Sequence, residues 1–219
     1  MPHILLPRRS PPGRRPKEPV KGLLLFFGCG GLLCGPFFST AYADAGYREI
    51  IDSAGPHEEN GSVIRTGKDG TVDIALDRSW ENMIHLCENS QLDLLGYPAR
   101  QVELQNGRLF ALFEKESDPL TITAGHSRVK LSTGGFMLET GENGDGVKVF
   151  SEVIQFAHPG PDSVSDGFRE LSEGWKQRVP AAGGIQDPER MDYEDYADWQ
   201  KWFKQSYERR DNALVENNV

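Results

Sequence analysis

The chain has 219 residues, 37% hydrophobic and 26% charged, a length and composition that fit one modest domain with additional segments rather than two full domains. Its net charge of −9 is unevenly distributed. Residues 1–43 contain six basic residues and one acidic residue, which leaves 18 basic and 32 acidic residues for the rest of the chain. Because so acidic a body repels phosphate backbones and anionic membrane surfaces, the sequence argues against nucleic-acid binding.

Residues 1–43 have the organisation of a secretory signal peptide. Six basic residues precede the apolar run 22–38, and Ala41 and Ala43 then supply the small side chains that signal peptidase requires. Cleavage after Ala43 makes Asp44 the first residue of the mature chain. The alternative is an uncleaved anchor, although glycines weaken this apolar stretch as a membrane-spanning helix. The predicted location is periplasmic or secreted, with membrane attachment only if the segment is retained.

The cysteines set a limit on covalent stabilisation. Cys29 and Cys34 lie inside the segment that cleavage removes, so Cys87 is the one cysteine of the predicted mature chain. A single cysteine forms no internal disulfide. In "MIHLCEN" it is predicted to be a small buried side chain in a strand rather than a reactive thiol.

The mature chain is predicted to be all-β, because short stretches alternate apolar and polar residues between turn residues. No helical crossover of a parallel α/β sheet is recognisable. We expect an antiparallel β-sandwich or a short β-solenoid of about eleven strands, followed by a C-terminal amphipathic helix. The expected strands are 62–66, 71–77, 82–87, 91–95, 100–104, 108–113, 120–123, 128–132, 135–140, 147–150 and 153–157.

The segments outside this β domain, residues 62–157, have a different character. Residues 44–61 are polar and interrupted by Gly and Pro, and are predicted to be a lead-in with one helical turn at 47–52. Residues 158–186 are rich in Gly, Pro and Ser, which predicts an irregular linker with possible strands.

The C-terminal helix is predicted over 187–210, with Asp187 as N-cap and Pro188 in the first helical position. The remaining residues, 211–219, are predicted to be a disordered tail. The helix carries an aromatic face that we expect to pack on the β domain, with an exposed partner-binding face as the alternative. That face consists of Tyr196, Trp199, Phe203 and Tyr207, with Trp202 beside it.

The motifs of residues 62–157 resemble, in order and spacing, the FecR domain. Thr66-Gly67 precedes a strand, "NSQLDL" (89–94) follows, and Leu104 to Leu109 leads into the later strands. The sequence departs from the family pattern at 132–136, where the family has Gly-Thr, and at 151–152, where it often has Glu-Gly.

This resemblance implies an extracytoplasmic β-rich module. Family members that also have a cytoplasmic anti-sigma domain and a membrane helix relay a signal from an outer-membrane transporter to a sigma factor. Only about twenty residues precede the apolar run here, so we expect a stand-alone exported version. The expected partner is an envelope protein, either a transporter or a membrane regulator.

A cell-wall glycan is the alternative ligand. Exposed aromatic rings stack on sugar rings, and the chain has four tryptophans, Trp80, Trp175, Trp199 and Trp202. Trp80 is the strongest candidate, because it lies beyond a strand end in "DRSWENM". Trp80, Trp199 and Trp202 are the predicted binding residues, and a purely structural envelope role is the remaining possibility.

No catalytic constellation is recognisable, and we predict a non-enzymatic protein without metal or cofactor; a hydrolase is the least favoured class. His85 and Glu88 are three apart in an expected strand and therefore point to opposite faces. His126 and His158 lie in expected turns. The acidic, glycine-rich stretch 139–149 offers oxygen ligands for Ca²⁺ but does not complete an EF-hand loop, so a solvated hairpin is favoured.

Overall fold

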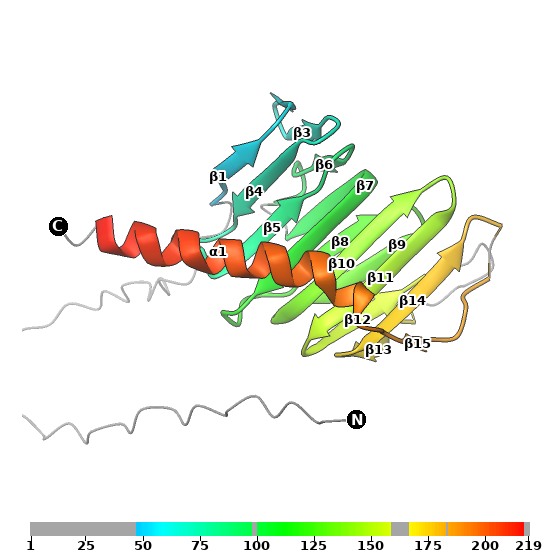
Figure 1. Cartoon of the computed structure of the whole chain (residues 1–219). Coiled ribbons are helices and arrows are strands. Elements are labelled where there is room, and N and C mark those ends of the chain that lie inside the picture. Colours follow the sequence, from blue (N-terminus) through cyan, green and yellow to red (C-terminus); the bar gives the residue numbers. More distant parts are fainter. Residues whose placement is uncertain (1–46, 98–99, 159–166, 183, 217–219) are drawn as a thin grey trace, which may run out of the picture. The chain divides into compact units, whose positions relative to one another are not determined.

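The computed structural model describes residues 47–97, 100–158, 167–182 and 184–216 (Figure 1). The predicted signal peptide, with Cys29, Cys34 and the Ala43–Asp44 bond, lies outside these residues. Across the described ranges, no helix combines the length and the apolar composition that a membrane span needs. The described residues belong to one compact unit.

The described residues form fifteen strands and one long helix, which confirms the all-β prediction with a C-terminal helix. In chain order the elements are β1 (Glu49–Ala54), β2 (His57–Asn60), β3 (Val63–Thr66), β4 (Thr71–Ala75), β5 (Asn82–Leu86), β6 (Gln91–Asp93), β7 (Gln101–Phe113), β8 (Leu120–Ala124), β9 (Ser127–Leu131), β10 (Gly134–Gly141), β11 (Gly144–Ser151), β12 (Val153–Ala157), β13 (Arg169–Ser172), β14 (Trp175–Pro180), β15 (Glu189–Arg190), the 3₁₀ turn η3 (Glu194–Tyr196) and α1 (Ala197–Glu216).

The strands make one curled sheet whose two layers meet at β7. One layer has the order β1-β4-β5-β7-β10-β11-β14-β15, and the other has the order β2-β3-β6-β7-β8-β9-β12-β13. All the strand pairs are antiparallel except β7 with β8, which are parallel. The two predicted strands 100–104 and 108–113 are one strand, β7, in which Gly107 has φ +91°. A strand that bends in this way passes from one layer to the other.

A single apolar core lies inside the curl. Alternate residues of both layers point into it, as the period of two in a strand requires. On β4 these are Val72 and Ile74, and on β12 they are Ile154 and Phe156, all fully buried or nearly so. For most of the predicted strands, the residues expected to point into the core do so.

The predicted lead-in 44–61 is wrong where the structure describes it. Residues 49–54 and 57–60 form β1 and β2 in place of a helical turn and a loop. Ile50 of β1 packs against the core, whereas all four residues of β2 are exposed. A strand whose side chains are nearly all exposed shows no apolar alternation, so its pairing with β3 decides its structure.

The C-terminal region agrees with the prediction in part. The expected linker 158–186 contains β13 and β14, in line with the possible strands predicted there. The helix, however, does not begin at Asp187, because Glu189 and Arg190 pair with β14. Asp192 is the residue that caps the helical segment: its carboxylate accepts the N–H groups of Glu194 (2.9 Å) and Asp195 (3.1 Å). The helix then continues to Glu216, six residues beyond the predicted end at 210.

Helix α1 packs across the outer face of the layer that contains β5, β7, β10 and β11 (Figure 1). Residues on these strands alternate between the inner core and a second apolar cluster beneath the helix. Trp199 and Trp202 of α1 complete this second cluster. Its other members come from the strands, or in the case of Cys87 from the residue after β5, and are Met83, Cys87, Phe110, Leu112, Met137 and Phe150. The aromatic face of the helix therefore packs on the β domain, as expected.

Candidate functional site

The helix-covered face is the outer surface of β4, β5, β7, β10 and β11 beneath α1, and two of the predicted binding residues lie in it. Trp199 is 7% exposed and Trp202 is 3% exposed. Trp199 stacks on Phe150 with 4.5 Å between ring centroids, and Trp202 stacks on Phe110 at 5.7 Å. Both indole rings are covered by protein, so in this structure neither presents a surface to a sugar.

A glycine on β10 makes room for Trp199. A Cβ atom built on Gly135 would lie 2.6 Å from Cη2 and 2.7 Å from Cζ2 of that indole. Since real Cβ atoms do not approach other atoms so closely, the ring sits directly on the backbone of β10. Gly135 thus has a packing role in this structure.

A buried charge network attaches the middle of the helix to the sheet. Asp73 of β4 is 3% exposed and faces α1. Its carboxylate accepts hydrogen bonds from Nδ1 of His85 (2.6 Å) and Nε1 of Trp202 (2.9 Å), and it forms an ion pair with Arg209. Arg209 also pairs with Asp52 of β1 at 2.8 Å. A buried carboxylate with several donors and cations is well compensated for its loss of water.

His85 is held in its charged form by this network. Burial acts to lower its pKa, but hydrogen bonds to Asp73 and Cys87 outweigh that effect and raise the pKa to about 9. Burial likewise acts to raise the pKa of Asp73, and bonding to His85 and Arg209 reverses this and lowers it. At neutral pH the network therefore consists of a carboxylate between an imidazolium and a guanidinium.

Asp73, His85 and Cys87 bring together the residue types of a nucleophilic site, yet their surroundings favour a structural role. Cys87 is 4% exposed and packs in the cluster beneath the helix. A neighbouring groove of about 380 Å³ reaches His85 and Cys87 and is also lined by Arg108 and Asp198, which form an ion pair at 3.3 Å. With Asp73 bonded to two helix residues, the arrangement is best explained as the attachment of α1.

A second ion-pair cluster attaches the start of the helix. Asp195 of η3 accepts Nζ of Lys148 (2.8 Å) from β11 and Nζ of Lys176 (2.9 Å) from β14. Burial acts to raise the pKa of Asp195, but these two bonds outweigh it and hold the pKa well below its usual range. The helical segment is thus attached by charge at η3 and at Arg209, and by the aromatic packing of Trp199 and Trp202 between them.

The other two tryptophans are half-buried. Trp80, the favoured glycan-stacking residue, packs against the cluster beneath the helix and has a left-handed backbone with φ +55°. Trp175 packs against the inner core, and the guanidinium of Arg190 lies 4.4 Å from its ring centroid. The structure does not gather the four tryptophans into one exposed platform.

A hollow of about 730 Å³ lies near the β10–β11 hairpin and brings His126 close to His158, with 6.1 Å between ring centroids. Asp145, from the predicted acidic turn, borders it. Its carboxylate accepts Oγ of Ser127 (2.8 Å) and Oγ1 of Thr140 (2.6 Å), so it is engaged within the protein. Among the described residues, no group of three or more His, Cys, Asp or Glu side chains is placed to hold a metal ion.

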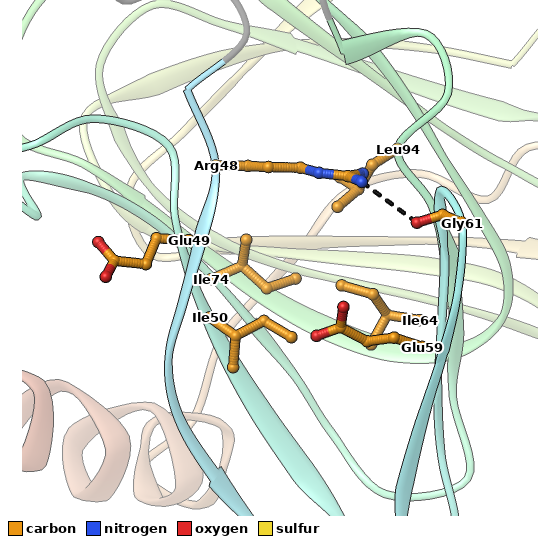
Figure 2. Close-up of a pocket in the computed structure, with 8 residues that line it drawn as sticks. All are labelled: Arg48, Glu49, Ile50, Glu59, Gly61, Ile64, Ile74 and Leu94. Atoms are coloured by element: carbon orange, nitrogen blue, oxygen red, sulfur yellow. Dashed lines mark hydrogen bonds between the residues drawn. The ribbon is translucent and has the colours of Figure 1, made fainter.

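The side of the curl formed by β1 and β2 is open, and Figure 2 shows a small notch between these strands. β1 pairs with β4 and β2 pairs with β3, and the described residues provide no strand on the other side of either. We call this site the edge notch. It has a volume of about 90 Å³ and is lined by Arg48, Glu49, Ile50, Glu59, Gly61, Ile64, Ile74 and Leu94.

The sequence predicts neither the charge network nor the edge notch. Its spacing places Glu88 on the opposite face from His85 and does not reveal the residue that His85 contacts, Asp73, which lies opposite it in the β4–β5 pair. A charged residue inside the apolar run "TVDIALD" was the available signal that something covers the outer face of this strand. The edge notch gave no signal, because β2 was not predicted.

Comparison with solved structures shows a shared fold. A crystal structure described as a "putative anti-sigma factor" from Parabacteroides distasonis matches 63% of this chain and 64% of its own length, with a TM-score of 0.50 and 17% identity. A second structure with the same description matches 70% of this chain and 64% of its own, with a TM-score of 0.43 and 17% identity. This chain therefore spans less than two thirds of these neighbours. No protein-family model and no curated protein matches the chain.

Proposed function

We propose that this protein is a non-catalytic binding module of a signalling system in the bacterial cell envelope, and that it binds a transporter or membrane regulator through its sheet edges. The observation that carries the proposal is the pair of edge strands β1 and β2. Each is bonded on one side only among the described residues, and all four residues of β2 are exposed. Unpaired strand edges are templates for another extended segment.

The rest of the molecule directs attention to these edges. The outer face of one layer is already occupied by α1, and the large aromatic side chains of that face are buried under it. The likeness in fold to a putative anti-sigma factor and the resemblance of residues 62–157 to the FecR domain support a regulatory role. The signal peptide predicted at residues 1–43 supports an envelope location. No specific observation favours the glycan alternative.

Site-specific photo-cross-linking in living cells tests the proposal. A photoreactive amino acid replaces Glu58, an exposed residue of β2, and in a matched strain it replaces Gln200, an exposed residue of α1. After irradiation, the tagged chain is purified under denaturing conditions and its cross-linked partners are identified by mass spectrometry. We expect one transporter or membrane regulator to be captured from position 58 and not from position 200.

Two results would contradict the proposal. Capture from position 200 alone would assign binding to the helix rather than to the sheet edge. Absence of any protein partner from both positions, with the chain present in the envelope, would favour a structural or glycan-binding role.

A further inference from the structure

We propose that the edge notch receives a lysine or arginine side chain of an extended partner segment that pairs with β2. This inference rests on the proposed function and names the chemistry of the partner at its edge. Three features carry it: the apolar floor of the notch, the carboxylate of Glu59 at its rim and the edge of β2 that no described strand pairs with.

The floor of the notch is aliphatic. Ile64, Ile74 and Leu94 are 5%, 1% and 2% exposed, and Ile50 is half-buried beside them. A floor of this kind accepts methylene groups. At about 90 Å³ the notch is smaller than the several hundred cubic ångströms typical of small-molecule sites, but it has room for one long side chain.

Glu59 gives the notch its charge preference. In β2 it lies opposite Ile64, whose side chain enters the core, so Glu59 points inward as well. Figure 2 shows its carboxylate turned into the gap between β1 and β2. No ion pair or hydrogen bond involves this carboxylate among the described residues. A lysine or arginine combines a methylene stem for the floor with a cation for Glu59.

The other two charged side chains that line the notch lie away from the Glu59 carboxylate (Figure 2). Arg48, at the opposite end, donates to the carbonyl oxygen of Gly61 at 3.1 Å, as Figure 2 shows. Glu49 lies on the far side of β1, where it accepts a hydrogen bond from Tyr47. Of the other acidic side chains of residues 47–61, Glu58 pairs with Arg65 at 4.0 Å and Asp52 pairs with Arg209 at 2.8 Å, so Glu59 supplies the charge preference of the notch.

β2 is the better pairing edge of the two. The register of β1 is interrupted by a bulge between Ile50 and Asp52, and bulges are one way in which proteins blunt an edge. The β2–β3 register is regular over all four residues. A segment added to β2 places the residue opposite Glu59 on the inward face, where its side chain enters the notch.

Inward-pointing charges also protect sheet edges from aggregation, and Glu59 alone would serve that purpose. A charge-swap experiment separates the two roles. The probes are two fluorescent, capped eight-residue peptides of alternating valine and threonine, one with a central lysine and one with a central glutamate. Binding to the full chain is measured by fluorescence anisotropy, and protection of β2 amides is measured by hydrogen exchange.

We expect the lysine peptide to bind, to slow exchange at residues 57–60, and to lose affinity about two- to five-fold with Glu59→Gln, the range of a cross-strand charge pair. Glu59→Lys should invert the preference and bind the glutamate peptide. Glu103→Gln, an exposed acid of β7, is the matched control and should leave the affinity unchanged.

The inference is overturned if neither peptide binds, or if Glu59→Lys leaves the charge preference unchanged. Self-association of the Glu59 variants without peptide binding would also overturn it, and would assign Glu59 to protection of the sheet edge. These failures are distinct from failure of the proposed function. A partner cross-linked from position 58 in cells, together with no charge preference in the peptide assay, would retain the proposed function and reject the role of the notch.

Discussion

The network around Asp73 should make the stability of the protein depend on pH in a range where few side chains titrate. The folded state raises the pKa of His85 from an ordinary value of 6.5 to about 9. The folded state therefore binds a proton more tightly than the unfolded state does. The stabilisation is fully present below pH 6.5, declines as pH rises, and is lost above about pH 9.

The size of this effect follows from the two pKa values. A rise from 6.5 to about 9 corresponds to about 3 kcal/mol of unfolding free energy. The side chain of His85 is 14% exposed and that of Asp73 is 3% exposed, so solvent screening reduces this figure little. In Asp73→Asn the imidazolium loses its carboxylate partner, so most of the pH dependence between pH 6.5 and 9 should disappear.

Urea unfolding at pH 6 and pH 9, followed by tryptophan fluorescence, measures the effect. Wild type should be about 3 kcal/mol less stable at pH 9, whereas Asp73→Asn should show little difference and should be the less stable protein at pH 6. His85→Phe retains the ring between Phe110 and Trp202 and is the second variant, which should also lack the slope. A slope that persists in both variants would refute the assignment to His85.

Three further predictions concern local packing, capping and processing. Gly135→Ala should lower stability by about 1–3 kcal/mol, because its methyl group meets Trp199, whereas Gly141→Ala, which faces open space, should be tolerated in the same thermal denaturation assay. Asp192→Ala should cost about 1 kcal/mol, because it removes a cap from two backbone N–H groups. Asp187→Ala should cost little, and an equal loss would contradict the observed helix start. The intact mass of the chain recovered from the envelope should lack residues 1–43; the full mass would show that the segment is retained.

The inner core could be predicted from the sequence because its signal is local. Val72 and Ile74, like Val129 and Leu131, alternate with polar residues, and a period of two fixes their faces before the partner strand is known. The curl could not be predicted in the same way. It depends on Gly107, which lets β7 bend between the two layers, whereas the sequence pattern suggested two separate strands there.

Strand β2 and the start of the helical segment could not be predicted from local sequence. β2 contains no buried residue, so its own sequence shows no apolar alternation. Its strand structure comes from pairing with β3 and from the two-residue connection to β1. At the other end, Asp187-Pro188 has the composition of a helix start, yet the backbone of Glu189 and Arg190 pairs with β14. The capping role passes to Asp192, because tertiary pairing overrides a local preference.

The carboxylates of the two charge clusters at α1 have partners within the chain, whereas the carboxylate at the edge notch has none among the described residues. Asp73 and Asp195 are surrounded by cations and donors from the chain itself, so their burial is compensated and they hold the helix in place. Glu59 is an acidic side chain of the described region that is directed at an apolar notch and has no such partner. If attachment of the helix were the regulated step, substitutions at Asp73 should alter partner capture from position 58; if the edge notch acts alone, they should change stability and leave capture intact. We expect the second outcome, because α1 covers the outer face of the sheet while the notch opens between β1 and β2.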